Sequence, residues 1–275
     1  MPMSFICQHG TVLGMDTGLE GKGVVVTGGA GGIGSAVVRA FADEGARVAV
    51  HYRTSSERAD ALAQEVSGVT VAADLTVEDE ADRLVQSAVE RLGRVDVLVA
   101  NAGKWPDEDV PVWEMSYERW RSTVTANLDS VFLSCRSFLR HVATTGEGNI
   151  VIVSSTAGIF GEAGHSDYAS AKAGLIGGLL RSLKNEIVRV APNGRVNVVC
   201  PGWTVTEMAR SALADPTVEP RVTRTMSLKK LGKPEDVARV IVSLASDRIS
   251  GHVTGEVITV AGGMEGRVLH ELPDH

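Results

Sequence analysis

Short runs of small and β-branched apolar residues alternate along this chain with longer segments in which apolar residues recur every three or four positions. The short runs predict buried strands, and the longer segments predict helices. This alternation predicts an α/β fold in which one parallel sheet is doubly wound, with helices on both faces. The predicted strands are residues 23–27, 47–52, 69–73, 95–100, 149–153, 195–199 and 256–260. The predicted helices lie between the first loop and Gly45, and at residues 57–66, 77–92, 117–141, 166–190 and 235–245.

Two stretches lack a clear period. Residues 104–115 predict a loop with a short helical piece, and residues 201–230 predict an irregular segment. Because the second stretch follows the carboxyl end of a strand, we expect it to cover a substrate. No repeat or linker divides the chain. The pattern therefore predicts a flexible N-terminal extension at 1–20, one domain over 21–263 and a C-terminal tail at 264–275.

Composition narrows the class of protein. The chain has 275 residues, of which 44% are hydrophobic, enough for one large core. The net charge of −7 and the lack of a basic block argue against nucleic acid as a partner. No apolar run approaches the ~18 residues of a membrane span, and the start does not resemble a secretory signal. Cys7, Cys135 and Cys200 are widely spaced, which favours a reducing cytoplasm, and no metal-ligand cluster is present.

A glycine-rich segment follows the first predicted strand and opens the first predicted helix. Residues 27–34 read TGGAGGIG. Glycines permit a tight turn and let backbone N–H groups approach a pyrophosphate, which the helix N-terminus also attracts. In this context the segment predicts a dinucleotide site. The residues expected to bind there are Gly28, Gly31, Gly32, Ile33 and Gly34.

A second constellation carries proton chemistry. Lys172 follows Tyr168 by four positions, so both side chains project from one helix face, and Ser155 precedes Tyr168 by thirteen positions. A nearby cation is expected to lower the tyrosine pKa from its ordinary value of about 10. The phenol could then exchange a proton with an alkoxide, while the serine hydroxyl holds the same oxygen. Taken alone, however, the pattern YxxxK is more often an ordinary surface pair.

These motifs occur together in a fixed order. They are TGxxxGxG at 27–34, Asn-Ala-Gly at 101–103, Asn127, Ser155, Tyr168, Lys172 and Pro201-Gly202. From about Lys22 to Gly263 the chain resembles the short-chain dehydrogenase/reductase family, and in particular its 3-oxoacyl-acyl-carrier-protein reductase type members. The resemblance implies a single Rossmann-like domain and hydride transfer between a nicotinamide and a carbonyl or secondary alcohol.

The resemblance also implies roles for individual residues. Tyr168 would donate the proton, Ser155 would bind the reacting oxygen, Lys172 would hold the nicotinamide ribose, and Asn127 would hold a relay water. The implied cofactor contacts are Asp74 and Leu75 at the adenine, Asn101, Ala102 and Gly103 at the ribose, Tyr168 and Lys172, and Pro201, Gly202, Thr204 and Thr206 around the nicotinamide and phosphates. For Asp74 a place in a helix N-cap, with Thr76 as the competing cap, stays equally open.

The choice of cofactor depends on the end of the second predicted strand. By the resemblance, Tyr52 stands where an NAD-binding member would carry Asp, and Arg53 and Thr54 follow it. The planar cation of Arg53 suits a 2′-phosphate, so the sequence favours NADP(H). Gly31 argues against this, because NADP-binding members often carry a basic residue within the glycine loop. NAD therefore remains open, as does a solvated position for Arg53.

These motifs are compatible with three functions. An NADPH-dependent ketone reductase of the 3-oxoacyl type is favoured, and an NAD-dependent alcohol, sugar or steroid dehydrogenase is the alternative. A non-catalytic dinucleotide sensor is disfavoured, because it would need none of the proton chemistry. The predicted partners are a small carbonyl or alcohol substrate and further copies of the chain. Helices 117–141 and 166–190 carry apolar residues on more than one face, which favours a homotetramer or homodimer.

Overall fold

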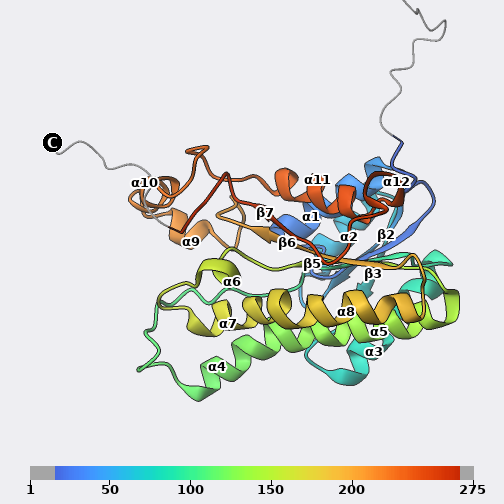
Figure 1. Ribbon diagram of the computed structural model, residues 1–275, viewed down its shortest axis with the longest axis horizontal. Coiled ribbons are helices and arrows are strands. Elements are labelled where there is room, and N and C mark those ends of the chain that lie inside the picture. Colours follow the sequence, from blue (N-terminus) through green and yellow to red (C-terminus); the bar gives the residue numbers. More distant parts are fainter. Residues whose placement is uncertain (1–15, 267–275) are drawn as a thin grey trace, which may run out of the picture.

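The computed structural model describes residues 16–266, so residues 1–15 and 267–275 of the predicted extension and tail lie outside that part. Its centre is a seven-stranded parallel sheet with the order β3-β2-β1-β4-β5-β6-β7 (Figure 1). The strands are β1 (Gly23–Val26), β2 (Arg47–Tyr52), β3 (Val69–Ala72), β4 (Val97–Ala100), β5 (Asn149–Val153), β6 (Arg195–Pro201) and β7 (Val257–Val260). The order reverses beside β1, which confirms the doubly wound sheet.

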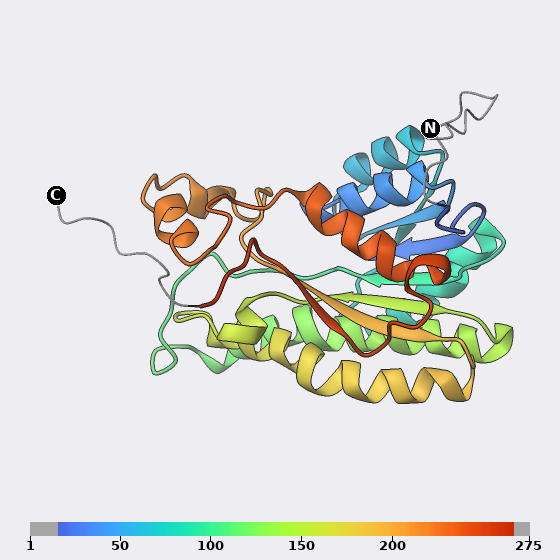
Figure 2. The ribbon, with the colours of Figure 1, turned by 45° about the horizontal axis from the view of Figure 1, so that its top comes forward.

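Helices cover both faces of this sheet (Figures 1 and 2). On one face lie α1 (Gly32–Asp43), α2 (Ser56–Glu65) and α11 (Pro234–Ala245). On the other lie α3 (Glu78–Leu92), α5 (Ser130–Thr145) and α8 (Leu180–Glu186). Because the strands are buried from both sides, β1 and β4 are apolar and buried at every position.

The two long predicted helices are continuous but each contains a wider turn. The first consists of α4 (Tyr117–Val124), the π-helical turn η1 (Thr125–Asp129) and α5. The second consists of α7 (Ser166–Gly174), the π-helical turn η2 (Leu175–Leu179), α8 and the 3₁₀ turn η3 (Ile187–Arg189). Such turns insert a residue into the helix and are frequent at functional sites. The broad apolar pattern of these segments did not reveal them.

Several short elements were missed for a similar reason. Four-residue and six-residue helices are too short to show a period. They are α6 (Ala157–Phe160), α9 (Arg210–Leu213), α10 (Val218–Thr223) and α12 (Asp247–Ser250). Conversely, residues 104–115 contain a turn but no helix, so the predicted helical piece was wrong. Within the predicted extension, Thr17 and Leu19 are buried, and Ser246 Oγ donates a hydrogen bond to Thr17 O at 2.6 Å.

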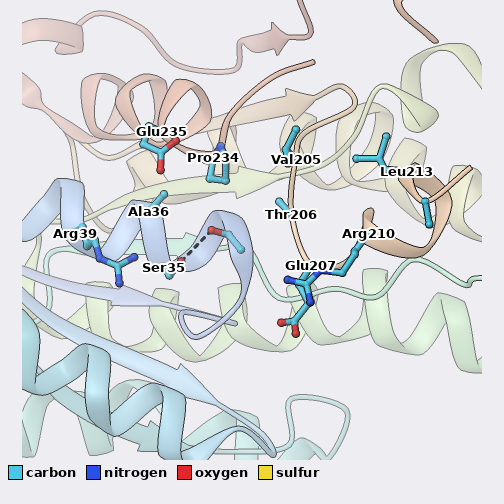
Figure 3. Close-up of a pocket in the computed structure, with 12 residues that line it drawn as sticks. Ser35, Ala36, Arg39, Val205, Thr206, Glu207, Arg210, Leu213, Pro234 and Glu235 are labelled. Carbon is cyan, nitrogen blue, oxygen red and sulfur yellow. Dashed lines mark hydrogen bonds between the residues drawn. The ribbon is translucent and has the colours of Figure 1, made fainter. Parts of the chain in front are cut away.

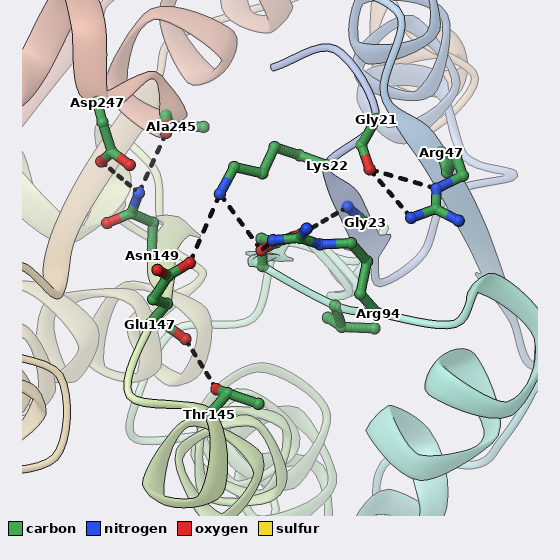
Figure 4. A network of polar contacts seen from close by, with 12 residues as sticks. Gly21, Lys22, Gly23, Arg47, Arg94, Thr145, Glu147, Asn149, Ala245 and Asp247 are labelled. Carbon is green, nitrogen blue, oxygen red and sulfur yellow. Dashed lines mark hydrogen bonds and ion pairs between the residues drawn. The ribbon is translucent and has the colours of Figure 1, made fainter. Parts of the chain in front are cut away.

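At their amino ends, neighbouring strands are joined by a polar network (Figure 4). Asp96 Oδ2 accepts hydrogen bonds from Gly23 N at 2.8 Å and from Arg94 Nε at 2.7 Å. Lys22 Nζ lies 3.5 Å from Asp96 Oδ1 and 3.7 Å from Glu147 Oε2. None of these residues lines the large cavity described below. The network therefore stabilises the amino ends of the strands, and the candidate site lies at their carboxyl ends.

Candidate active site

A cavity of about 1170 Å³ runs along the carboxyl ends of the strands. Every residue predicted to contact a cofactor lines it, and so does Ser155. These residues are Gly28, Gly31, Gly32, Ile33, Gly34, Tyr52, Arg53, Thr54, Asp74, Leu75, Asn101, Ala102, Gly103, Ser155, Tyr168, Lys172, Pro201, Gly202, Thr204 and Thr206. The remaining predicted site residue, Asn127, is fully buried and does not line the cavity. The fold thus brings together residues that are more than 170 positions apart in the chain.

The glycine-rich loop has a shape that side chains would prevent. Gly28 has a φ of +62°, in the left-handed region. At Gly34, a Cβ atom would lie 2.2 Å from Gly28 O, so a side chain there would force the loop open. The helix α1 begins at Gly32, directly beyond the turn. Its unpaired N–H groups and positive dipole end therefore lie at the cavity wall, where they suit a pyrophosphate.

Asn101 and Thr27 attach this loop to the end of β4. Thr27 Oγ1 accepts hydrogen bonds from Asn101 N and Ala102 N, both at 2.9 Å. In return, Asn101 Nδ2 donates to Thr27 O at 2.9 Å. The side-chain amide of Asn101 thus braces two adjacent cavity walls.

His51 is a site residue that the sequence analysis did not single out. It is 3% exposed; its Nδ1 accepts a hydrogen bond from Gly28 N at 2.9 Å, and its Nε2 donates to Ala73 O at 3.0 Å. Because Gly28 N and Ala73 O fix one donor and one acceptor, the imidazole is neutral with its proton on Nε2. Burial lowers the pKa of His51 to about 4. The one available signal was a histidine directly after the apolar run VAV at residues 48–50.

Asp74 makes a turn of its own rather than a helix cap. Its Oδ1 accepts hydrogen bonds from Thr76 N at 2.9 Å and Thr76 Oγ1 at 2.7 Å, and these bonds lower the pKa of Asp74. The N-cap of α3 is Val77, so neither Asp74 nor Thr76 occupies that position. Arg53 Nη1 lies 3.9 Å from Asp74 Oδ2, and its side chain is 57% exposed.

Tyr168 stands in α7 among apolar neighbours. It is 9% exposed and clusters with Ala157 and Ala169, against which Trp105 packs. Burial raises the pKa of the Tyr168 phenol, whereas hydrogen bonding to the Ser155 hydroxyl lowers it; burial dominates. Like an ordinary tyrosine, the phenol is protonated at neutral pH and can donate a proton.

Lys172 does not lower the pKa of Tyr168 here, contrary to the sequence-based prediction. Its Nζ lies 5.7 Å from the centre of the Tyr168 ring and donates a hydrogen bond to Val153 O at 3.1 Å. Burial also lowers the pKa of Lys172 to about 8, so the amine is still mostly protonated at pH 7 but loses its charge at a lower pH than an ordinary lysine. The prediction considered the spacing of the two side chains but not the desolvation of both groups.

Gly103 brings Lys172 close to Asn127. A Cβ atom on Gly103 would lie 2.7 Å from Asn127 Oδ1 and 3.2 Å from Lys172 Nζ. Asn127 Nδ2 donates hydrogen bonds to Lys104 O at 2.8 Å and Thr123 O at 3.0 Å, and its Oδ1 accepts from Lys104 N at 3.1 Å. Asn127 thus braces the segment that follows β4, and its role with a relay water stays a prediction.

Beyond Tyr168 the cavity has a wall of aromatic and acidic side chains. The Trp105 ring stacks on His165 with centroids 4.7 Å apart and meets Trp203 edge-on at 6.4 Å. Trp105 Nε1 donates a hydrogen bond to Glu162 Oε1 at 3.2 Å. Glu162 and His165 were missed as cavity residues, because a loop of this kind shows no period in the sequence.

The segment after β6 lies over the glycine loop. A hollow of about 560 Å³ separates its residues Val205–Leu213 from α1 (Figure 3). A Cβ atom on Gly32 would lie 2.7 Å from Thr206 Cβ, and Glu207 forms an ion pair with Arg58 of α2. The predicted covering segment therefore contacts the nucleotide half of the cavity.

A glycine loop at a helix N-terminus, joined in one cavity to a serine, a tyrosine and a lysine, defines an oxidoreductase that uses a nicotinamide dinucleotide and acts on CH–OH or C=O groups. A family model described as enoyl-(acyl carrier protein) reductase matches residues 28–265. The chain belongs to the short-chain dehydrogenase/reductase family.

The proteins to which this chain is similar include both reductases and dehydrogenases. The chain is 38% identical over 251 residues to the 3-oxoacyl-[acyl-carrier-protein] reductase FabG of Thermotoga maritima, covering 90% of this chain and 98% of that protein. It is 37% identical over 253 residues to the L-rhamnose 1-dehydrogenase (NAD(P)(+)) of Azotobacter vinelandii, covering 88% and 96%. The crystal structure of gox2181 superposes with a TM-score of 0.82 at 29% identity, covering 89% of this chain and 95% of that one. Within residues 16–266, no helix combines the length and apolar character needed to cross a membrane.

Proposed function

We propose that this protein is an NADPH-dependent ketone reductase of the 3-oxoacyl type. The observation that carries the proposal is the cavity itself, in which Ser155, Tyr168 and Lys172 lie together with the glycine-rich loop. The name of the similar Thermotoga maritima reductase supports a 3-oxoacyl substrate. The unit that performs the reaction would be the single domain 21–263.

NADPH would supply the hydride for the carbonyl carbon. The Ser155 hydroxyl donates a hydrogen bond to the carbonyl oxygen, and Tyr168 transfers its phenolic proton to that oxygen as negative charge develops there. The product is a secondary alcohol, and Tyr168 is left as a phenolate that must be reprotonated. Lys172 would hold the nicotinamide ribose, and Arg53 would face the 2′-phosphate.

A second candidate is an alcohol or sugar dehydrogenase that uses NAD or NADP. The similarity to an L-rhamnose 1-dehydrogenase favours it, and so does the acidic Glu162 in the wall beyond Tyr168. This reaction reverses the proton transfer, because Tyr168 would take the proton from an alcohol. Its raised pKa implies that oxidation would accelerate as the pH rises, whereas reduction would not.

The decisive experiment removes one oxygen atom. We expect Tyr168→Phe to bind NADPH as wild type does and to lose about 10²–10⁴-fold in kcat, since only the proton donor is removed. Fluorescence titration with NADPH and turnover of a 3-oxo ester measure the two quantities. Ordinary turnover by the Tyr168→Phe variant would refute the assignment of the proton donor.

We also propose a homotetramer in the cytoplasm. The outer faces of both long helices support the assembly: Phe132 is 46% exposed, and Gly177 and Gly178 have open space where a Cβ would lie. The two described cysteines, Cys135 and Cys200, are buried and free, which suits a reducing compartment.

A further inference from the structure

Glu162 places a carboxylate on the substrate side of the cavity. It lies in the loop between α6 and α7, six positions before Tyr168, and lines the cavity together with Trp105 and His165. Its Oε1 accepts the indole hydrogen bond of Trp105 at 3.2 Å. Its Oε2 makes no hydrogen bond within residues 16–266. One oxygen thus anchors the side chain, and the other is available as an acceptor.

His165 lies beside Glu162 and directs its one hydrogen bond away from that carboxylate. It is 5% exposed, stacks on Trp105, and its Nε2 lies 2.9 Å from Pro106 O, which can only accept. The proton of a neutral ring is therefore on Nε2, and Nδ1 carries a lone pair. This Nδ1 is buried without a partner and faces Glu162 Oε1 at 3.8 Å. His165 thus makes no hydrogen bond to Glu162 in this structure, although the two groups lie 3.8 Å apart.

Negative charge also prevails around this corner. Burial raises the pKa of Glu162, His165 and the hydrogen bond from Trp105 lower it, and the charges of Asp109 and Asp167 raise it further. Asp167 forms an ion pair with Arg119, whose Nε lies 3.1 Å from Asp167 Oδ2. Lys104 and Arg221 line the same cavity but are not among the groups that act on Glu162. The negative charge of Glu162 in turn raises the pKa of the Tyr168 phenol, beside which the carbonyl oxygen would bind.

We propose that Glu162 determines substrate specificity by accepting a hydrogen bond, through Oε2, from a hydroxyl group next to the reacting carbon. The same charge disfavours substrates with a carboxylate at that position. Among the neutral ketones that the proposed function covers, Glu162 therefore favours those with such a hydroxyl over those that lack it, and it disfavours ketones with a carboxylate there. This inference rests on the proposed function, because Tyr168 fixes where the reacting carbon lies.

Two matched pairs of ketones test the inference. Hydroxyacetone and butanone have the same size and differ by a hydroxyl in place of a methyl group, while methyl acetoacetate and acetoacetate differ by a neutral methyl ester in place of a carboxylate. For wild type we expect kcat/KM to favour hydroxyacetone and methyl acetoacetate by about tenfold or more within each pair. Glu162→Gln, which keeps an acceptor oxygen, should use acetoacetate about tenfold better and retain part of the hydroxyl preference. Glu162→Leu should lose both preferences.

The control is Glu108→Gln, which makes the same change at an exposed carboxylate outside the cavity and should leave both ratios as in wild type. NADPH titration of every variant checks that the nucleotide half is intact. If the ketones are reduced but no Glu162 variant changes the kcat/KM ratio within either pair, this inference is overturned and the proposed function stands. If wild type reduces none of the four ketones, the proposed function fails, and the inference fails with it.

Discussion

At the scale of single residues, His51 and Tyr168 show how burial changes chemistry that the sequence suggests. The motif residues could be predicted, because glycine, tyrosine and lysine at fixed spacings have few other uses together. Their protonation could not, because desolvation depends on neighbours far away in the chain. His51 was missed since a single histidine has no spacing to interpret, yet it connects the glycine loop to the end of β3.

Loss of His51 should therefore weaken nucleotide binding through the shape of the loop. We expect His51→Leu to raise the Kd for NADPH by about tenfold, because Gly28 N loses its acceptor, and His51→Gln to restore part of the affinity. Isothermal titration measures both. Equal affinities of the two variants would show that the hydrogen bond does not hold the loop.

His51 also predicts a pH dependence of stability. Its pKa is about 4 when folded and 6.5 when unfolded, so the unfolded chain binds the extra proton first as the pH falls. Stability should decline between about pH 6.5 and pH 4, by at most about 3 kcal/mol from this residue. Urea unfolding across this window should show a shallower decline for His51→Gln. An identical slope in both proteins would contradict the assignment.

Arg53 decides the cofactor in our proposal. We expect wild type to bind NADPH several-fold more tightly than NADH, and Arg53→Ala to lose about tenfold for NADPH alone, since only NADPH carries the 2′-phosphate. Fluorescence titration with both nucleotides measures this. Arg39→Ala is the matched control, because Arg39 pairs with Glu65 outside the large cavity. Equal loss for both nucleotides would mean that Arg53 does not read the phosphate.

At the scale of elements, strands and helices were largely predictable, whereas local departures from regularity were not. β2 and β5 have the predicted bounds, because their apolar runs end at charged or small residues. The π turns η1 and η2 were hidden, since widening a turn by one residue barely disturbs a broad apolar face. In consequence Asn127 lies in a geometry that a uniform helix would not give it.

The network at the amino ends of the strands makes an element-scale prediction. Burial raises the pKa of Asp96, but hydrogen bonds from Arg94 and Gly23 N, with the charge of Lys22, lower it below its ordinary value of 3.8. This carboxylate therefore stabilises the fold above about pH 4, and its contribution is lost as the pH falls further. We expect Asp96→Ala to unfold more easily at pH 7 by about 1–3 kcal/mol, and the difference from wild type to shrink in acid. Urea unfolding at both pH values measures this, and a constant difference would contradict it.

At the scale of the whole molecule, the sequence indicates a large apolar surface but not how copies of the chain would pair. Both long helices lie on the same side of the sheet, and the exposed Phe132 is on α5 (Figure 1). Light scattering should give the mass of a tetramer for wild type and a smaller mass for Phe132→Asp. Val112→Asp changes a residue that is 63% exposed in a loop elsewhere and should leave the mass unchanged. A monomeric wild type would contradict the assembly.

The polar network and the cavity lie at opposite ends of the sheet. This separation affects how the protein can evolve. Residues around Glu162 can be exchanged without disturbing the contacts of Asp96. Substitutions around Glu162 can therefore change the substrate specificity while the stability of the fold is retained. A library that randomises the wall beyond Tyr168 should yield mostly well-folded enzymes, which makes this scaffold a convenient starting point for directed evolution.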